Sequence, residues 1–360
     1  MHLYINSAPP PPSPTPHVIP ACLALPLCHI STQLGITPIL RYADNVLWNW
    51  HIPRAHPLEL PTESRIRSHT LFSGTPDEEH FCLISARIEL RGVAALRVMR
   101  STLDELFIGD VTAVRRIVAY LTRLSSIIDE LTGLGATSDK RGWIFEGVDD
   151  ATAAKVSSLS GPSAGQSSLI HALEFFLGVD HERGEGRGAE PTFLTKMEQF
   201  MPRHHRLFLQ HLRRPHRHLR EFVLSTHAAY SAHIFNDRGM PWFASSTAGR
   251  APRASLFQTA AVGESGLKAA TELQMAYDNS VAALKRFRDG HIKIATRYIV
   301  NMARSQVAQQ PIEVDTRGEL TTDGIKGTGG TSLVPFLKEC RNNTVRAMAH
   351  PPSPALGQQH

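Results

Sequence analysis

The feature that most constrains the fold of this chain is the 3.6-residue spacing of its apolar side chains, which recurs through most of its length. This spacing places the apolar residues on one face of a helix, and sustained alternation, which would predict strands, is scarce. The helical segments are 96–107, 111–134, 166–178, 193–212, 270–303 and 333–349. We therefore predict an all-α protein.

The chain has 360 residues, enough for one large domain. The proline-rich start, with "APPPPSPTP" at 8–16, predicts a disordered tail over 1–18, and 350–360 form a second tail. The domain then spans 19–349. Residues 227–264 lack a sustained period and are rich in Ser, Ala, Gly and Pro, so we expect an irregular insertion there.

Charge and cysteine content exclude several classes of protein. The 38 basic and 33 acidic residues are interspersed, so the net charge of +5 predicts no nucleic-acid partner. The densest basic run, 205–222, has apolar residues at helical intervals and is expected to be a solvated helix face. The four cysteines have no C-x-x-C spacing, which argues against a zinc site or a disulfide framework and favours a reducing, cytoplasmic setting. Prolines interrupt the apolar stretch 18–30, so no membrane segment is expected.

One histidine lies in the middle of an apolar stripe. On a helix, His291 shares its face with Leu284, Phe287, Ala295 and Tyr298. Two interpretations are open. The imidazole is a core residue whose nitrogens have hydrogen-bond partners, which periodicity alone favours, or it is a metal ligand, because a neutral imidazole in an apolar pocket can hold a haem iron.

Several motifs are more specific than periodicity, and they resemble the indoleamine 2,3-dioxygenase family in order and spacing. The resemblance covers about 19–349, with the insertion excepted. The motifs are "LGITPILRYADNVLWNW" (34–50), "HFCLISARIEL" (80–90), "GPSAGQSS" (161–168), "MPRHHRLFL" (201–209), "REFVLS" (220–225), "AYDNSVAAL" (276–284), "RDGHIKIATRYI" (288–299) and "KGTGGTSLVPFLK" (326–338).

The resemblance implies an all-helical, monomeric protein that holds one haem b and opens the C2–C3 bond of the indole ring of L-tryptophan. Dioxygen and an external reductant are the other partners implied, and N-formylkynurenine is the product. His291 matches the family's proximal iron ligand, and Arg288 matches its arginine near a haem propionate. On the distal side, Ser85 matches the serine near bound dioxygen and Phe81 the aromatic residue that packs against the indole.

Five further residues match the lining of the substrate pocket. Tyr42 and Val46, in "YADNV", match its wall, and the "GPSAG" turn brings backbone near the substrate at Ser163 and Ala164. Thr328, in "GTGGT", matches a mobile lid at the amino-acid end of the substrate. Without the resemblance, Val46 would be read as a core residue and the glycine-rich loop as a linker.

The chain also departs from the family. The family carries an aromatic pair, with an arginine four residues later that binds the substrate carboxylate, on a helix for which 128–147 leaves no room. Arg141 lies in this gap, but no aromatic pair precedes it. Pro162 replaces a glycine, and the amino-terminal small domain is largely missing. Together the missing helix, the insertion and the short start resemble exon errors in a gene model.

These departures keep alternatives open. A catalytically impaired haem-binding homologue is the main one, because the carboxylate-binding arginine is lost. "GPSAG" also satisfies G-x-S-x-G, the nucleophile elbow of serine hydrolases, but 149–160 is small and polar where the elbow needs an apolar strand. Tryptophan 2,3-dioxygenases do not match the "GTGGT" or "SAGQSS" segments.

Overall fold

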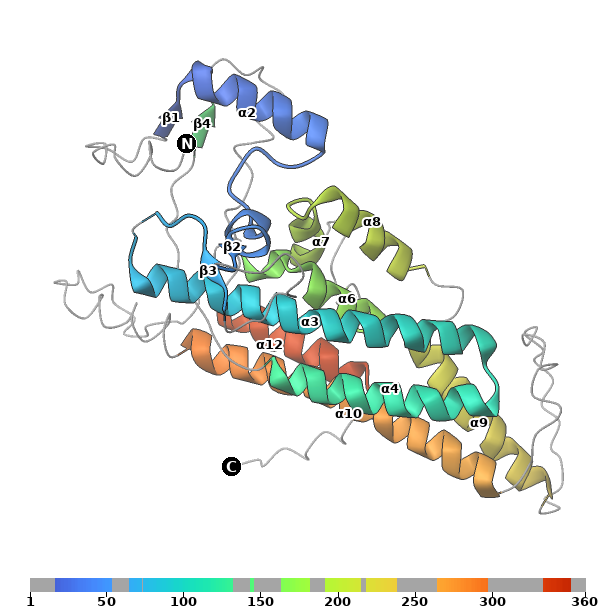
Figure 1. Cartoon of the computed structure of the whole chain (residues 1–360). Coiled ribbons are helices and arrows are strands. Elements are labelled where there is room, and N and C mark those ends of the chain that lie inside the picture. Colours follow the sequence, from blue (N-terminus) through green and yellow to red (C-terminus); the bar gives the residue numbers. More distant parts are fainter. Residues whose placement is uncertain are drawn as a thin grey trace, which may run out of the picture.

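Three long helices form the centre of the protein in a computed structural model that describes residues 17–53, 65–72, 74–131, 143–145, 163–181, 192–214, 218–237, 264–296 and 333–350 (Figure 1). They are α3 (Pro76–Ile108), α4 (Val111–Glu130) and α10 (Glu264–Ala295). A tight hairpin joins α3 to α4. Gly109 ends α3 in the left-handed conformation at φ 69°, and the Asp110 side chain accepts a hydrogen bond from the Ala113 amide to begin α4.

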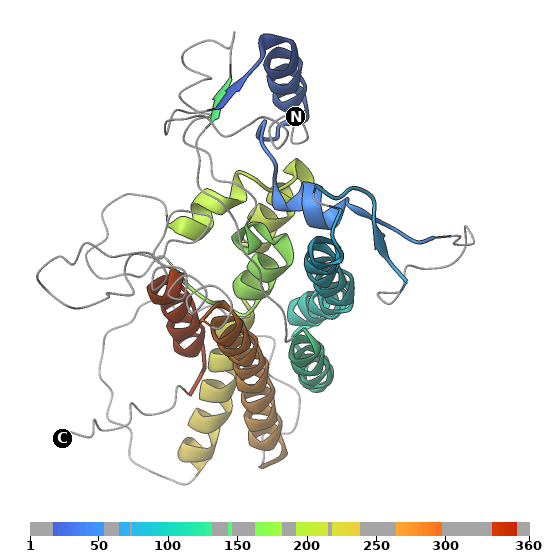
Figure 2. The ribbon, with the colours of Figure 1, turned by 90° about the vertical axis from the view of Figure 1, so that its left-hand side faces the viewer.

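Shorter helices surround this centre (Figure 2). Helices α9 (Leu219–Asp237) and α12 (Leu333–Arg346) pack against α10, and α6 (Ser168–Phe176) packs against α3 and α8 (Arg203–Leu212). The short helix α7 (Phe193–Glu198) contacts the 3₁₀ turn η2 (Ala164–Gln166). The helices therefore bury their apolar faces against one another, as in other helical domains.

The amino-terminal segments lie at one side of the long helices (Figure 1). Strand β1 (His17–Ile19) pairs in parallel with β4 (Trp143–Phe145), and α2 (Ala21–Leu34) follows β1. The π-helical turn η1 (Ala43–Leu47) packs on α3, and β2 (Trp50–His51) pairs antiparallel with β3 (Arg67–Ser68).

The main core lies between α4 and α10. The buried residues of α4 follow a spacing of three and four, which makes one continuous apolar face. Polar side chains in this core find backbone partners, since Tyr277 donates to the Leu177 carbonyl at 2.7 Å and Ser280 donates to the Leu121 carbonyl at 2.9 Å. The fully buried residues of the α4 face are Ile117, Leu121, Leu124 and Ile128.

The predicted all-α class is confirmed, and the differences lie at helix ends. The predicted helix 193–212 is two helices, because Pro202 cannot continue the first one and instead precedes α8. Segments 80–90 and 96–107 belong to the single helix α3. Helix α10 begins at Glu264, earlier than predicted, and its predicted end at 303 lies outside the described residues.

Two boundary predictions are wrong. The irregular insertion was expected at 227–264, but α9 continues to Asp237 and α10 begins at Glu264. The part of this range between the two helices, 238–263, lies outside the described residues. Residues 17–18 were assigned to the disordered tail, but they belong to β1. Among the described residues, no helix is both long enough and apolar enough to cross a membrane.

The crossing of α3 and α6 depends on Gly92. A Cβ at this position would lie 2.1 Å from Cδ2 of Leu169, which is buried in the main core. We predict that Gly92→Val destabilises the protein by about 2 kcal/mol, because overpacking a dense core costs roughly 1–3 kcal/mol. Urea denaturation measures this loss. Adding Leu169→Ala to Gly92→Val should recover part of it, and strictly additive losses would contradict the assigned contact.

Candidate functional site

Two sets of contacts at the carboxyl end of α4 show which parts of α3 and α10 lie together. Arg91 of α3 donates from Nη1 to the Glu130 carbonyl at 2.8 Å. Arg286 of α10 donates to both carboxylate oxygens of Asp129, at 2.8 and 2.7 Å. The end of α4 is therefore flanked by Arg91 on one side and Arg286 on the other.

Beyond this point α4 stops while α3 and α10 continue (Figure 1). Ser85 lies less than two turns before Arg91 on α3, and His291 lies less than two turns after Arg286 on α10. Because α10 runs parallel to α4 and α3 runs antiparallel to it, both residues extend past the same end of α4. The structure thus places the predicted proximal and distal residues at one end of the bundle.

His291 is partly buried on α10. Burial lowers the pKa of its imidazole, and the nearby positive charge of Arg288 lowers it further. The ring is therefore neutral at pH 7, with a nitrogen lone pair available. The iron-ligand and core-histidine interpretations of this ring both stay predictions.

Arg288 is buried, with 8% of its surface exposed, and its guanidinium joins three helices. It donates to the Glu174 carboxylate of α6 and to the Cys340 carbonyl of α12. Burial lowers the pKa of Arg288, opposed by the neighbouring side chain of Cys340. The alternative of an exposed helix cation is therefore wrong. The role at a haem propionate stays a prediction.

The partner of Arg288 was not foreseen from the sequence. Glu174 is 1% exposed and lies within the apolar segment "SLIHALEFF" of α6. Its Oε2 is 3.4 Å from Nε2 of His181, whose pKa burial lowers to about 4. The sequence signal that could have identified Glu174 is a single carboxylate in an otherwise apolar helix, because a buried charge requires a partner.

A small apolar cluster lies between α3 and the η1 segment. Tyr42 and Val46 are buried in it, together with Ile66, Leu83 and Ala86. Phe81 is 39% exposed one turn before Ser85, so its ring is available to a ligand.

Ser163 and Ala164 lie in a turn that contacts η1. Ser163 has extended backbone at φ −144°, and its hydroxyl accepts a hydrogen bond from the Gly165 amide at 3.2 Å. In the same turn, Oε1 of Gln166 accepts a hydrogen bond from the Tyr42 amide at 2.9 Å. The structure therefore places Gln166, which directly follows the "GPSAG" turn, against the "YADNV" segment. A shared substrate pocket stays a prediction. Thr328, Arg141 and Pro162 lie outside the described residues.

The hydrolase alternative lacks its required geometry in the described part of the chain. A nucleophile elbow places serine on a strained turn between a sheet strand and a helix. The sheets found among the described residues are the two-stranded pairs β1–β4 and β2–β3, and neither lies at Ser163. The Ser163 hydroxyl is instead bonded to the Gly165 amide.

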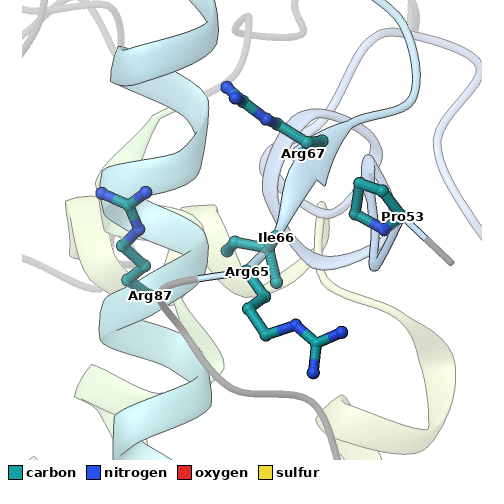
Figure 3. Close-up of a pocket in the computed structure, with 5 residues that line it drawn as sticks. All are labelled: Pro53, Arg65, Ile66, Arg67 and Arg87. Atoms are coloured by element: carbon teal, nitrogen blue, oxygen red, sulfur yellow. The ribbon is translucent and has the colours of Figure 1, made fainter. Parts of the chain in front are cut away.

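A cavity of about 420 Å³ lies beside α3, outside the predicted pocket (Figure 3). It is lined by Pro53, Arg65, Ile66, Arg67 and Arg87. Arg87 is two residues from both Ser85 and Glu89, so it projects from a different face of α3. Arg67 is paired with Glu79 at 3.3 Å. The cavity therefore borders the Tyr42 cluster through Ile66, but its arginine-rich lining lies on another face of α3 than Ser85.

The fold is a helical bundle, and the neutral imidazole of His291 and the apolar cluster of Tyr42 and Val46 lie toward the same end of it. The family model for indoleamine 2,3-dioxygenase matches residues 1–136 and 134–347. The chain belongs to the indoleamine 2,3-dioxygenase family, a family of dioxygenases.

Known relatives are similar over most of the chain. An indoleamine 2,3-dioxygenase of Saccharomyces cerevisiae is 29% identical over 96% of this chain and 75% of its own length. Indoleamine 2,3-dioxygenase 1 of Rattus norvegicus is 27% identical over 92% of this chain and 73% of its own. A 6-hydroxytryptophan 2,3-dioxygenase of Fusarium equiseti is also 27% identical, over 92% and 75%.

The Arg288–Glu174 pair gives a prediction about stability. Glu174→Gln leaves the buried guanidinium without its counter-charge, so we expect the free energy of unfolding of the apoprotein to fall by about 3–5 kcal/mol. Asp129→Asn on α4 is the control, because it breaks an exposed ion pair to the same helix α10, through Arg286, and should cost about 0–1 kcal/mol. Urea denaturation measures both, and equal losses would contradict the assigned burial.

Proposed function

We propose that this protein is a haem-dependent dioxygenase that opens the indole ring of L-tryptophan to give N-formylkynurenine. Family membership supports the dioxygenase class. The observation that carries the finer proposal is the neutral imidazole of His291 at the same bundle end as Ser85 and Tyr42. The reaction belongs to tryptophan catabolism, and we propose a cytoplasmic setting with an external reductant.

The residues around His291 fit a haem b. A porphyrin supplies four nitrogen ligands, so the iron needs only one imidazole from the protein, and a neutral ring is the form that binds. The His291 stripe carries Leu284 and Ala295, which are buried, beside the cation of Arg288. His291 would hold the haem iron, and the cofactor would supply the chemistry that activates dioxygen.

The chain's own residues bind and orient the substrate. The exposed ring of Phe81 offers a stacking surface for the indole, and the buried Tyr42 and Val46 make an apolar wall. The Ser85 hydroxyl lies one turn after Phe81, where it can donate to an oxygen beside the indole. Thr328 remains the proposed contact to the amino-acid end.

The carboxylate of tryptophan has lost the partner that the family provides. Between the end of α4 and β4, residues 132–142 read "TGLGATSDKRG", a segment with no aromatic residue. A hydrogen bond to a charged group contributes about 1.5–3 kcal/mol, so its loss weakens binding roughly ten- to a hundredfold. This favours a second candidate function, a haem-binding homologue with little turnover.

Haem binding tests the first part of the proposal. Reconstitution with haem b should give a Soret band that His291→Ala shifts or abolishes, because the mutation removes the side chain that would hold the iron. His204→Ala, at an exposed position on α8, is the control and should leave the band unchanged. An unchanged spectrum in His291→Ala would remove the ligand assignment.

Grafting the missing helix tests the second part. The chain as it stands should form N-formylkynurenine weakly or undetectably under reducing turnover with tryptophan. A family-like helix grafted between Leu134 and Trp143 should restore product absorbance, because it returns the arginine and the aromatic wall. Full activity in the ungrafted chain would show that the arginine is dispensable. No recovery would place the defect in Pro162 or elsewhere.

A further inference from the structure

A partly buried carboxylate lies where the predicted pocket segments meet. Glu89 is one turn after Ser85 on α3, on the same face of the helix. Its Oε1 accepts a hydrogen bond from the Tyr42 hydroxyl at 3.0 Å and another from the Ser167 hydroxyl at 2.6 Å. One oxygen atom therefore joins three separate segments of the chain.

Each partner belongs to a segment assigned to the pocket. Tyr42 begins η1, and its amide is also bonded to Gln166. Ser167 follows the Ser163–Ala164 turn and begins α6, where its hydroxyl accepts from the Ile170 amide. Glu89 therefore fixes η1 and the 163–167 turn against the part of α3 that carries Phe81 and Ser85.

The charges around Glu89 agree with an acceptor role. Burial raises the pKa of Glu89, opposed by the hydrogen bonds from Ser167 and Tyr42. Burial and the neighbouring Glu89 raise the pKa of Tyr42 well above its ordinary value, so the phenol keeps its proton and donates it. The nearby hydroxyls of Ser167 and Ser85 oppose this rise in pKa.

We propose that Glu89 is a positioning residue, which holds Tyr42 and the 163–167 turn in the arrangement that tryptophan binding requires. The inference rests on the proposed function, because it concerns the pocket of that reaction. Glu89 acts through Tyr42 and Ser167 and needs no contact with the substrate. The fold gives it this role because the three segments are linked at its side chain.

The first test compares two substitutions in the haem-loaded protein. Glu89→Ala should raise the dissociation constant of L-tryptophan, measured by spectral titration, about tenfold, and raise KM more than it lowers kcat. Glu89→Gln keeps an oxygen that accepts both hydrogen bonds and should stay within about threefold of the parent. The Soret band should be the same in all three proteins, since the proximal side is unchanged.

Glu105 provides the matched control. It is a carboxylate on the same helix α3, 8% exposed and paired with Arg116 at 3.1 Å, at the far end from Phe81. Glu105→Ala should lower stability but leave the tryptophan dissociation constant within about twofold. An equal loss of affinity in Glu89→Ala and Glu105→Ala would show that only general destabilisation is involved, and would overturn the proposal.

The second test needs neither haem nor turnover. In the apoprotein, a double-mutant cycle of Glu89→Ala and Tyr42→Phe should show coupling between the two residues. Each substitution changes the equilibrium constant of unfolding by some factor, and the factor for the double variant should differ about tenfold from the product of the two single factors. Strict additivity would overturn the proposal. Coupling in a protein that binds no haem would uphold the contact and reject the proposed function instead.

Two further outcomes of the first test are decisive. Unchanged tryptophan affinity in Glu89→Ala would overturn the positioning role even if the apoprotein coupling is present. A Glu89→Gln protein as impaired as Glu89→Ala would show that the carboxylate's charge or proton is what matters, and would also overturn it.

Discussion

The buried ion pair between Arg288 and Glu174 is the interaction on which the arrangement of the site depends. A guanidinium that is 8% exposed cannot be left unpaired, and Glu174, at 1%, cannot either, so α10 and α6 must meet in one register. His291 lies one turn beyond Arg288 on α10, so the pair also sets the direction of the imidazole. Another register between α10 and α6 would leave a buried charge unpaired, and the free-energy cost of that charge is the physical reason for the observed register.

Helix α6 links the ion pair near His291 to the predicted substrate pocket. Glu174 lies near its end and Ser167 at its start, and Ser167 donates to Glu89 on α3, which also accepts from Tyr42. Gly92 allows α3 and α6 to approach closely just beyond this contact. One short helix therefore connects the predicted iron ligand to the predicted substrate pocket, and a shift of α6 would move both.

Periodicity predicted the helices but not their partners. The spacing of Ile117, Leu121 and Leu124 shows which face of α4 is buried, because burial of one face is the physical origin of the pattern. Pro202 broke a helix that the apolar spacing had continued, and α9 ran into a segment whose composition had suggested a loop. Local composition predicts the ends of helices poorly, because most of the stability of a helix comes from tertiary packing.

The residues of the candidate site also fall into those that the sequence predicted and those that it did not. His291, Ser85 and Tyr42 were found through motifs of the family. Glu174 lies in none of these motifs, and Glu89 lies in the motif 80–90 but had been assigned no role there. Their partners are distant in sequence, with 114 residues between Glu174 and Arg288, and periodicity contains no information about such pairs. The two matched stretches of the family model meet at 134–136, beside the segment where the arginine-bearing helix was expected.

The most direct test of the account is the iron–histidine bond itself. In resonance Raman spectra of the ferrous haem-loaded protein, we predict an iron–imidazole stretching band that shifts when the histidines are labelled with ¹⁵N. The band should be lost in His291→Gly and return when imidazole is added to fill the space left by the side chain. A band that persists in His291→Gly without imidazole, or no iron–imidazole band in the parent protein, would contradict the assignment of His291 and the site built around it.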